Sequence, residues 1–267
     1  MIDHIDYHVT NHCNLNCASC NNFCPLSDTW CVSYEDFCKE WQFVYDKGLR
    51  FNEIRILGGE TLLHPELDKL LIFLRSLFTD CPIIVYTNGI PLAQEKEKLL
   101  PIFQENNLTL FVSKYPTLKL DYDELLKGFS RVQVMPVTSF MNTCLHTEPD
   151  FNQEDSFRNC NVGSVWKCRA LKDYHIYPCS YVPNIPILIK YFPELQNTSI
   201  GKANIQESGI DIRTHTIEEI ENFIQHSIPF CTFCNSKKAR DFKPWSLTKY
   251  EISEWIEDGY VSNRSLP

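Results

Sequence analysis

Short apolar runs of strand-forming residues alternate with longer segments of helical periodicity from about residue 5 to about residue 135. The apolar runs occupy residues 5–9, 54–57, 83–86, 108–112 and 132–135, and the helical segments occupy 34–47, 65–78, 94–105 and 121–128. This alternation is the pattern of repeated β-α units around a parallel sheet. It predicts an α/β fold, either a wound sheet or a partly closed barrel, with its chemistry at the carboxyl ends of the strands.

The alternation ends after about residue 136. The rest of the chain is rich in asparagine, proline, cysteine and aromatic residues, and only residues 216–226 have a clear helical pattern. We therefore expect a first domain over residues 1–160 and a smaller cysteine-rich unit over residues 161–267.

Net charge and cysteine count narrow the class of protein. The 25 Lys and Arg against 34 Asp and Glu give a formal charge of −9, which argues against a nucleic-acid partner. No apolar run is long enough to span a membrane and no signal peptide opens the chain, so we expect a cytoplasmic protein. Because a reducing compartment does not maintain disulfides, the 13 cysteines indicate thiolates bound to metal.

A first group of cysteines, Cys13, Cys17 and Cys20, follows the first expected strand with CxxxCxxC spacing. Three thiolates this close can bind a cubic iron-sulfur cluster and leave its fourth iron without a protein ligand. A zinc site, which usually takes four protein ligands, and three unconnected buried thiols are the alternatives. The iron-sulfur interpretation is favoured because two further motifs also follow strands directly.

These motifs are Gly58-Gly59-Glu60 after the second strand and Thr87-Asn88-Gly89 after the third. Together with the three cysteines they make the chain similar to the radical S-adenosylmethionine enzymes. In that family the CxxxCxxC loop carries a 4Fe-4S cluster whose open iron binds S-adenosylmethionine, and one electron then cleaves the cofactor to a 5'-deoxyadenosyl radical. The resemblance implies a partial (β/α)6 barrel over the first domain.

The resemblance also implies a set of cofactor-binding residues. The glycines of the GGE motif let the backbone approach the cofactor, and the motif accepts a hydrogen bond from the methionine ammonium. The family usually places an aromatic residue directly before the third cysteine, where this chain has Ser19, and we expect Phe23 to substitute for it. The expected set is Gly58, Gly59, Glu60, Thr87, Asn88, Ser113 and Phe23.

A second group of cysteines, Cys168, Cys179, Cys231 and Cys234, lies in the C-terminal third and can form a closed four-thiolate site. Structural zinc is one interpretation of such pairs. Beside a radical domain, the arrangement resembles the twitch appendage, a shortened relative of the SPASM extension, which implies an auxiliary 4Fe-4S cluster. Cys160 lies only eight residues before Cys168, so it could replace one of these ligands.

Three residues near the expected domain junction are candidates for catalysis. A thiol is a good hydrogen-atom donor to a carbon radical, so Cys144 is one candidate, although an inert loop thiol is the simpler interpretation. Arg158 and Arg169 are the others, as groups that bind substrate or take part in proton transfer, a role also open to His146 and His175.

Relatives with a twitch appendage suggest the reaction. The enzyme that oxidises an aminocyclitol in aminoglycoside assembly is similar in length and cysteine layout, and epimerisation is the other expected outcome. The first strand begins at residue 5, which leaves no preceding domain for peptide-leader recognition. We therefore expect a sugar, cyclitol or sugar nucleotide as substrate and flavodoxin or ferredoxin as reductant. A ribosomal-peptide maturase and a non-catalytic iron-sulfur sensor are the alternatives.

Overall fold

The computed structural model of the protein describes residues 1–258. Its strands are β1 (Ile5–His8), β2 (Ile54–Leu57), β3 (Ile83–Thr87), β4 (Thr109–Lys114), β5 (Val132–Pro136), β6 (Ser139–Met141), β7 (Ala170–Lys172), β8 (His175–Tyr177), β9 (Ile210–Asp211) and β10 (Phe242–Pro244). Its helices are α1 (Tyr34–Asp46), α2 (Leu67–Leu77), α3 (Leu92–Glu105), α4 (Tyr122–Leu126), α5 (Gln153–Arg158), α6 (Ile185–Tyr191), α7 (Ser199–Lys202) and α8 (Ile217–Phe223).

Eight of these strands form one sheet in the order β5-β4-β3-β2-β1-β7-β8-β9. Strands β1 to β5 and β7 run parallel, whereas β8 and β9 are antiparallel to their neighbours. The predicted α/β fold is therefore confirmed. Strands β5 and β9 are the two edges, so the described strands form an open sheet.

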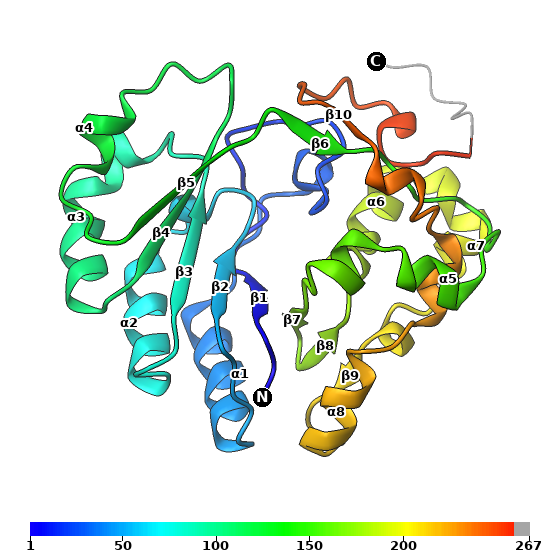
Figure 1. Ribbon diagram of the computed structural model, residues 1–267, viewed down its shortest axis with the longest axis horizontal. Coiled ribbons are helices and arrows are strands. Elements are labelled where there is room, and N and C mark those ends of the chain that lie inside the picture. Colours follow the sequence, from blue (N-terminus) through cyan, green and yellow to red (C-terminus); the bar gives the residue numbers. More distant parts are fainter. Residues whose placement is uncertain (259–267) are drawn as a thin grey trace.

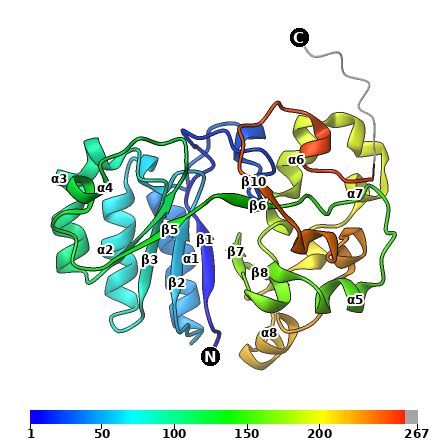
Figure 2. The same ribbon diagram turned by 45° about the horizontal axis from the view of Figure 1, so that its top comes forward.

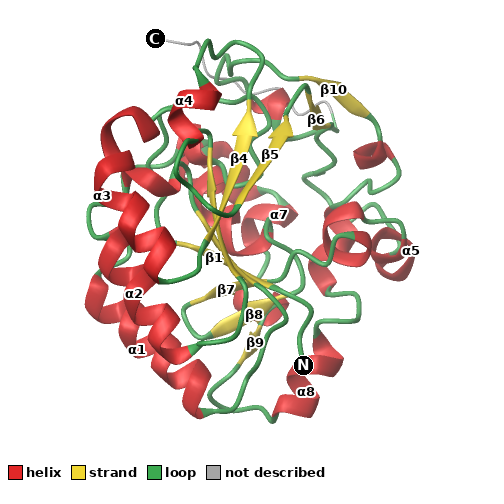
Figure 3. Cartoon of the chain, turned by 60° about the vertical axis from the view of Figure 1, so that its left-hand side comes forward, coloured by secondary structure: helices red, strands yellow, loops and turns green. Residues whose placement is uncertain are grey.

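Helices α1 to α4 cover one face of the parallel strands (Figures 1 and 3). Helix α1 begins at Ser33, whose side chain accepts a hydrogen bond from the Asp36 amide at 3.0 Å and so caps the first turn. Its apolar residues Phe37 and Trp41 are completely buried in a core shared with the strands. This rigid layer holds the carboxyl ends of β1 to β4 at one edge of the molecule.

A second core lies beside the first and involves mainly residues after Cys144, with Val182, Leu188 and Leu195 completely buried. The sequence predicted one helix in this part, and that prediction is wrong, because α5, α6 and α7 precede α8. Helix α6 begins with Pro186 in its first turn, and a short apolar segment of this kind has no helical periodicity to detect. The sheet continues across residue 160 through the pairing of β7 with β1, and the division into two domains stays a prediction.

The C-terminal segment returns to the top of the parallel sheet. Strand β10 pairs antiparallel with β6, and the two strands bridge the halves of the molecule (Figures 1 and 2). Among residues 1–258, no helix has the length and apolar character that a membrane crossing requires.

Candidate active site

One cavity of about 260 Å³ at the carboxyl ends of β1 to β4 contains the first cysteine group. Cys13, Cys17 and Cys20 all line it. Five of the seven residues expected to bind the cofactor line it as well, namely Gly58, Gly59, Thr87, Asn88 and Ser113. The fold thus brings together motifs that follow four different strands.

The glycines after β2 are required by close packing against the loop that follows β1. A Cβ atom at Gly59 would lie 2.5 Å from the carbonyl oxygen of His12, and one at Gly58 would lie 2.7 Å from that of Thr10. Real Cβ atoms do not approach oxygen this closely, so only glycine fits at either position. The Gly59 amide also donates to the Thr10 carbonyl at 2.7 Å. The glycines therefore position the cysteine loop itself, in addition to lining the cavity.

Glu60 is 1% exposed, and its carboxylate joins the loops after β2 and β3. It accepts hydrogen bonds from the Thr87 hydroxyl at 2.6 Å, the Asn88 amide at 2.7 Å and the Leu62 amide at 3.0 Å. Burial raises the pKa of Glu60 to about 7, and these donors oppose that shift. Glu60 does not line the cavity, and through these hydrogen bonds it positions Thr87 and Asn88, while its expected contact with the cofactor stays a prediction.

The surroundings of the three thiols fit an iron-sulfur cluster. The Leu15 amide is directed at the Cys13 sulfur at 3.4 Å, and the Trp245 indole N–H at the Cys17 sulfur at 3.1 Å. Such donors stabilise thiolates that ligate a cluster. Burial raises the pKa of both the Cys13 and Cys17 thiols to about 12, so these sulfurs need a metal to ionise at neutral pH.

A second group of thiols surrounds a small apolar cavity in the other half of the molecule. Cys160, Cys179, Cys231 and Cys234 line it together with Phe157, Val182, Ile228 and Phe230. Cys160 precedes a π-helical turn over Asn161–Val165, and its sulfur accepts from the Gly163 amide at 3.2 Å. In the described part of the chain, no three His, Cys, Asp or Glu side chains lie close enough to share one metal ion. Four thiols around one cavity can each bind a different iron of a cluster.

Cys168 does not line this cavity, so the cavity brings together three of the four predicted ligands and Cys160. Burial raises the pKa of Cys168 to about 12, and the charged groups that act on it include Asp6 on β1, Arg55 on β2 and the Cys160 thiol. Which of Cys160 and Cys168 is a ligand stays a prediction.

Comparison with known proteins shows which proteins this chain is similar to. No protein-family profile matches the chain. The subtilosin biosynthesis protein AlbA of Bacillus subtilis is 30% identical over 102 residues, which are 38% of this chain and 22% of AlbA. A GTP 3',8-cyclase of Nautilia profundicola is 32% identical over 103 residues, which are 37% of this chain and 31% of that cyclase. The GTP 3',8-cyclase of Petrotoga mobilis is 24% identical over 296 residues, which cover 99% of this chain and 87% of that cyclase. The chain thus spans less than a third of the length of the first two relatives.

A solved structure, that of BtrN in complex with AdoMet and 2-DOIA, has the same fold. It aligns with 88% of this chain and 93% of its own, with a TM-score of 0.53 and 15% identity. These relatives and this structural neighbour are radical S-adenosylmethionine (radical SAM) proteins. The chain is therefore similar in sequence and in fold to radical SAM proteins, and the cavity at Cys13, Cys17 and Cys20 is called the radical SAM cavity after this similarity. The cofactors of the family are S-adenosylmethionine and 4Fe-4S clusters.

The aromatic residues around the radical SAM cavity differ from those expected. Phe23 is completely buried in the second core, where its ring lies 6.2 Å from that of Tyr181, so it does not face the cofactor site. Tyr86, Tyr115 and Phe140 line the cavity instead. Sequence reasoning missed Tyr115 and Trp245, which lie far from the cysteine motif in sequence; the position of Tyr115 two residues after Ser113, at the end of β4, was the only local signal.

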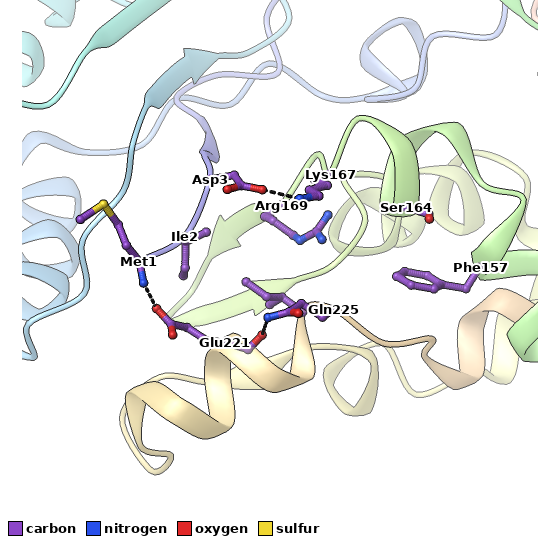
Figure 4. Close-up of a pocket in the computed structure, with 10 residues that line it drawn as sticks. Met1, Ile2, Asp3, Phe157, Ser164, Lys167, Arg169, Glu221 and Gln225 are labelled. Atoms are coloured by element: carbon purple, nitrogen blue, oxygen red, sulfur yellow. Dashed lines mark hydrogen bonds and ion pairs between the residues drawn. The ribbon is translucent and has the colours of Figure 1, made fainter.

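The three candidate catalytic residues lie outside the radical SAM cavity. Cys144 is buried beside Cys234, and the thiol contact between them contributes to raising the pKa of Cys234. Arg158 is on α5, with its side chain 74% exposed and paired with Asp155. Arg169 is buried, donates to the Gly163 carbonyl at 2.7 Å and lines a separate pocket near the start of β1 (Figure 4). Cys144 thus lies against the second thiol group, both arginines have structural contacts, and the catalytic roles of all three residues stay predictions.

A larger cavity of about 770 Å³ lies beside β1, β7 and α1, and Lys172, His175 and Glu40 are among the residues that line it. Apart from His175, none of the predicted site residues lines it. Volume therefore does not identify the active site in this molecule, whereas the convergence of the thiols and the glycine loop does.

Proposed function

We propose that the protein is a radical SAM oxidoreductase or epimerase that acts on a small polar molecule such as a sugar, a cyclitol or a sugar nucleotide. The observation that carries this proposal is the single cavity shared by Cys13, Cys17, Cys20 and the ends of the next three strands. When bound there, a 4Fe-4S cluster and S-adenosylmethionine supply a 5'-deoxyadenosyl radical that removes hydrogen from a substrate.

The residues of the cavity have distinct roles in this proposal. The three cysteines hold the cluster and leave one iron free for the cofactor. Asn88 and Ser113 offer polar side chains to the cofactor from the cavity wall. Glu60 keeps the loop at Asn88 in place through the Asn88 amide. The rings of Tyr86, Tyr115 and Phe140 exclude water from a site where a reactive radical would be quenched.

The second thiol group holds an auxiliary 4Fe-4S cluster through Cys160, Cys179, Cys231 and Cys234 in this proposal. Four protein ligands complete such a cluster, and its apolar cavity keeps water away. A closed cluster of this kind suits electron transfer from a substrate radical, which is what oxidation requires and epimerisation does not. A one-electron reductant such as flavodoxin or ferredoxin supplies the electron that the first cluster needs.

Two substrate classes have support from relatives. A fold shared over nearly the full length with BtrN, which acts on a sugar-like compound, favours a small polar substrate. The similarity to AlbA, named for the biosynthesis of the bacteriocin subtilosin, favours a peptide as the second candidate.

Formation of 5'-deoxyadenosine tests the proposal. Anaerobically reconstituted protein is mixed with reductant, S-adenosylmethionine and host extract separated into small-molecule and peptide fractions, with a Cys17→Ala variant as the control. We expect stimulation by the small-molecule fraction, with a product lighter by two hydrogens for oxidation or of unchanged mass for epimerisation.

Stimulation by the peptide fraction alone would make the protein a peptide-modifying enzyme. No 5'-deoxyadenosine with either fraction would support a non-catalytic sensor.

A further inference from the structure

The C-terminal segment pairs with the first cysteine loop along its backbone. The Ala18 amide donates to the Ser246 carbonyl at 3.0 Å, and the Thr248 amide donates to the Asn16 carbonyl at 2.8 Å. Cys17 and Leu247 form an antiparallel bridge between these two bonds. The segment is therefore held on the cysteine loop. Trp245 lies at its start, directly after β10.

Trp245 places its indole N–H 3.1 Å from the sulfur of Cys17. Indole is a donor only, so the Cys17 sulfur accepts this bond. The Trp245 ring is also fixed by the Tyr115 ring, whose centroid lies 5.4 Å away. Tyr115 lines the cavity, so the Trp245 ring is held against a residue of the cavity wall.

From these contacts we propose that Trp245 sets the reduction potential of the first cluster through its N–H···S hydrogen bond to Cys17. Reduction adds negative charge to the cluster and its sulfurs, and a hydrogen-bond donor directed at a ligand sulfur stabilises that charge. The reduction potential of the first cluster is therefore higher with the Trp245 indole N–H than it would be without it. This inference rests on the proposed function, because it requires a cluster at Cys13, Cys17 and Cys20.

The molecule contains a matched control in Trp255. Its indole N–H donates to the backbone carbonyl of Cys20 at 3.2 Å and not to a sulfur. Trp255 is buried and belongs to the same C-terminal segment. Substitution of either tryptophan by phenylalanine removes one indole N–H near the cysteine loop, but only Trp245→Phe removes a bond to a ligand sulfur.

An EPR-monitored redox titration of the reconstituted protein measures the effect, and the signal that changes on addition of S-adenosylmethionine identifies the first cluster. For Trp245→Phe we expect the midpoint potential to be more negative by about 59 mV. For a one-electron couple, this shift is a tenfold change in the ratio of reduced to oxidised cluster at a fixed potential. For Trp255→Phe we expect the wild-type midpoint. An unchanged midpoint in Trp245→Phe with an intact cluster would overturn the proposal.

Loss of the ring contact could unfold the segment in Trp245→Phe. Site-specific replacement of Trp245 by benzothienylalanine keeps the ring shape and removes only the N–H, and the same negative shift is expected. A wild-type protein with no signal that responds to S-adenosylmethionine contradicts the proposed function. A responsive signal that neither change at position 245 moves contradicts only the role of Trp245.

Discussion

The two cysteine groups differ in how the chain assembles them. The first comes from a single loop after β1, and its three thiols share a cavity with polar groups from neighbouring strand ends. The second comes from three separate segments, at Cys160, at Cys179 and at the turn that carries Cys231 and Cys234, and apolar side chains enclose it. The difference teaches that a site within one loop is fixed by local sequence, whereas a site assembled from distant segments is fixed by packing.

The surroundings of the two groups indicate different roles. The first cavity has Asn88 and Ser113 on its wall and suits a polar cofactor. The second has phenylalanine and aliphatic residues between its thiols and suits a cluster that exchanges electrons without binding a ligand. The largest experimental contrast should therefore come from removing one ligand of each group.

Removal of Cys17 should abolish cleavage of S-adenosylmethionine. Loss of a ligand is more severe than loss of an outer-shell partner, which already costs about 10- to 100-fold, so we expect less than about one-hundredth of wild-type 5'-deoxyadenosine formation in Cys17→Ala. About half of the bound iron should remain, in the second group. Cys81→Ala is the control, because the Cys81 thiol contacts the Phe51 carbonyl at 3.2 Å outside both groups. Equal activity in the two variants would mean that the first group is not the radical site.

Substitution of Cys160 and of Cys168 distinguishes the ligand set that lines the cavity from the set that the sequence suggested. We expect Cys160→Ala to lose the auxiliary cluster, and Cys168→Ala to retain it, because only Cys160 lies at the cavity with Cys179. Mössbauer spectroscopy of protein reconstituted with labelled iron measures the number of clusters. The reverse result would restore Cys168 as the ligand.

The same contrast explains how much the sequence could predict. Strand-forming runs and helical periodicity located β1 to β5 and α1 to α4 to within a few residues, because each of these segments has its own pattern. The CxxxCxxC and GGE motifs predicted the first cavity, because parallel strands bring their carboxyl ends to one edge.

The features that the sequence did not predict depend on contacts between distant segments, which leave no local sequence pattern. The π-helical turn over Asn161–Val165 lies between Cys160 and Cys168, and spacing alone did not decide which of these two thiols shares a cavity with Cys179. Trp245 reaches Cys17 only through the pairing of the C-terminal segment with the cysteine loop. Glu60 is fully engaged by Thr87 and Asn88, a role that became visible only when β2 and β3 were placed side by side.

Alanine substitution of a glycine in each site should give unequal losses of stability. A Cβ atom at Gly59 would lie 2.5 Å from the His12 carbonyl oxygen, whereas one at Gly163 would lie 3.2 Å from the Pro178 carbonyl oxygen. We expect Gly59→Ala to cost about 3 kcal/mol and Gly163→Ala about 1 kcal/mol, at the two ends of the usual range for overpacking. Anaerobic thermal unfolding measures both, at about 2–4 °C per kcal/mol. Equal shifts would contradict the tighter packing of the first loop.

The smallest expected effect is the difference in stability cost between losing a hydrogen bond to a carboxylate and losing one to a neutral carbonyl. In Thr87→Val the Glu60 carboxylate loses a donor at 2.6 Å, and in Ser156→Ala the Cys234 carbonyl loses a donor at 2.9 Å. Above pH 7, where Glu60 is ionised, we expect a cost of about 2 kcal/mol for Thr87→Val and about 1 kcal/mol for Ser156→Ala.

Only the first of these two costs should depend on pH. Because burial raises the pKa of Glu60 from 4.5 to about 7, the folded protein keeps a proton that the unfolded chain has released, and the contribution of Glu60 to stability falls as pH rises from 4.5 to 7. Loss of the Thr87 donor raises this pKa further and extends the fall to higher pH. Thr87→Val should therefore be less destabilising at pH 6 than at pH 8, while Ser156→Ala costs the same at both. A Thr87→Val cost that is equal at the two pH values would mean that Glu60 is already ionised at pH 6, and that the polar network of the first site is charged throughout this range.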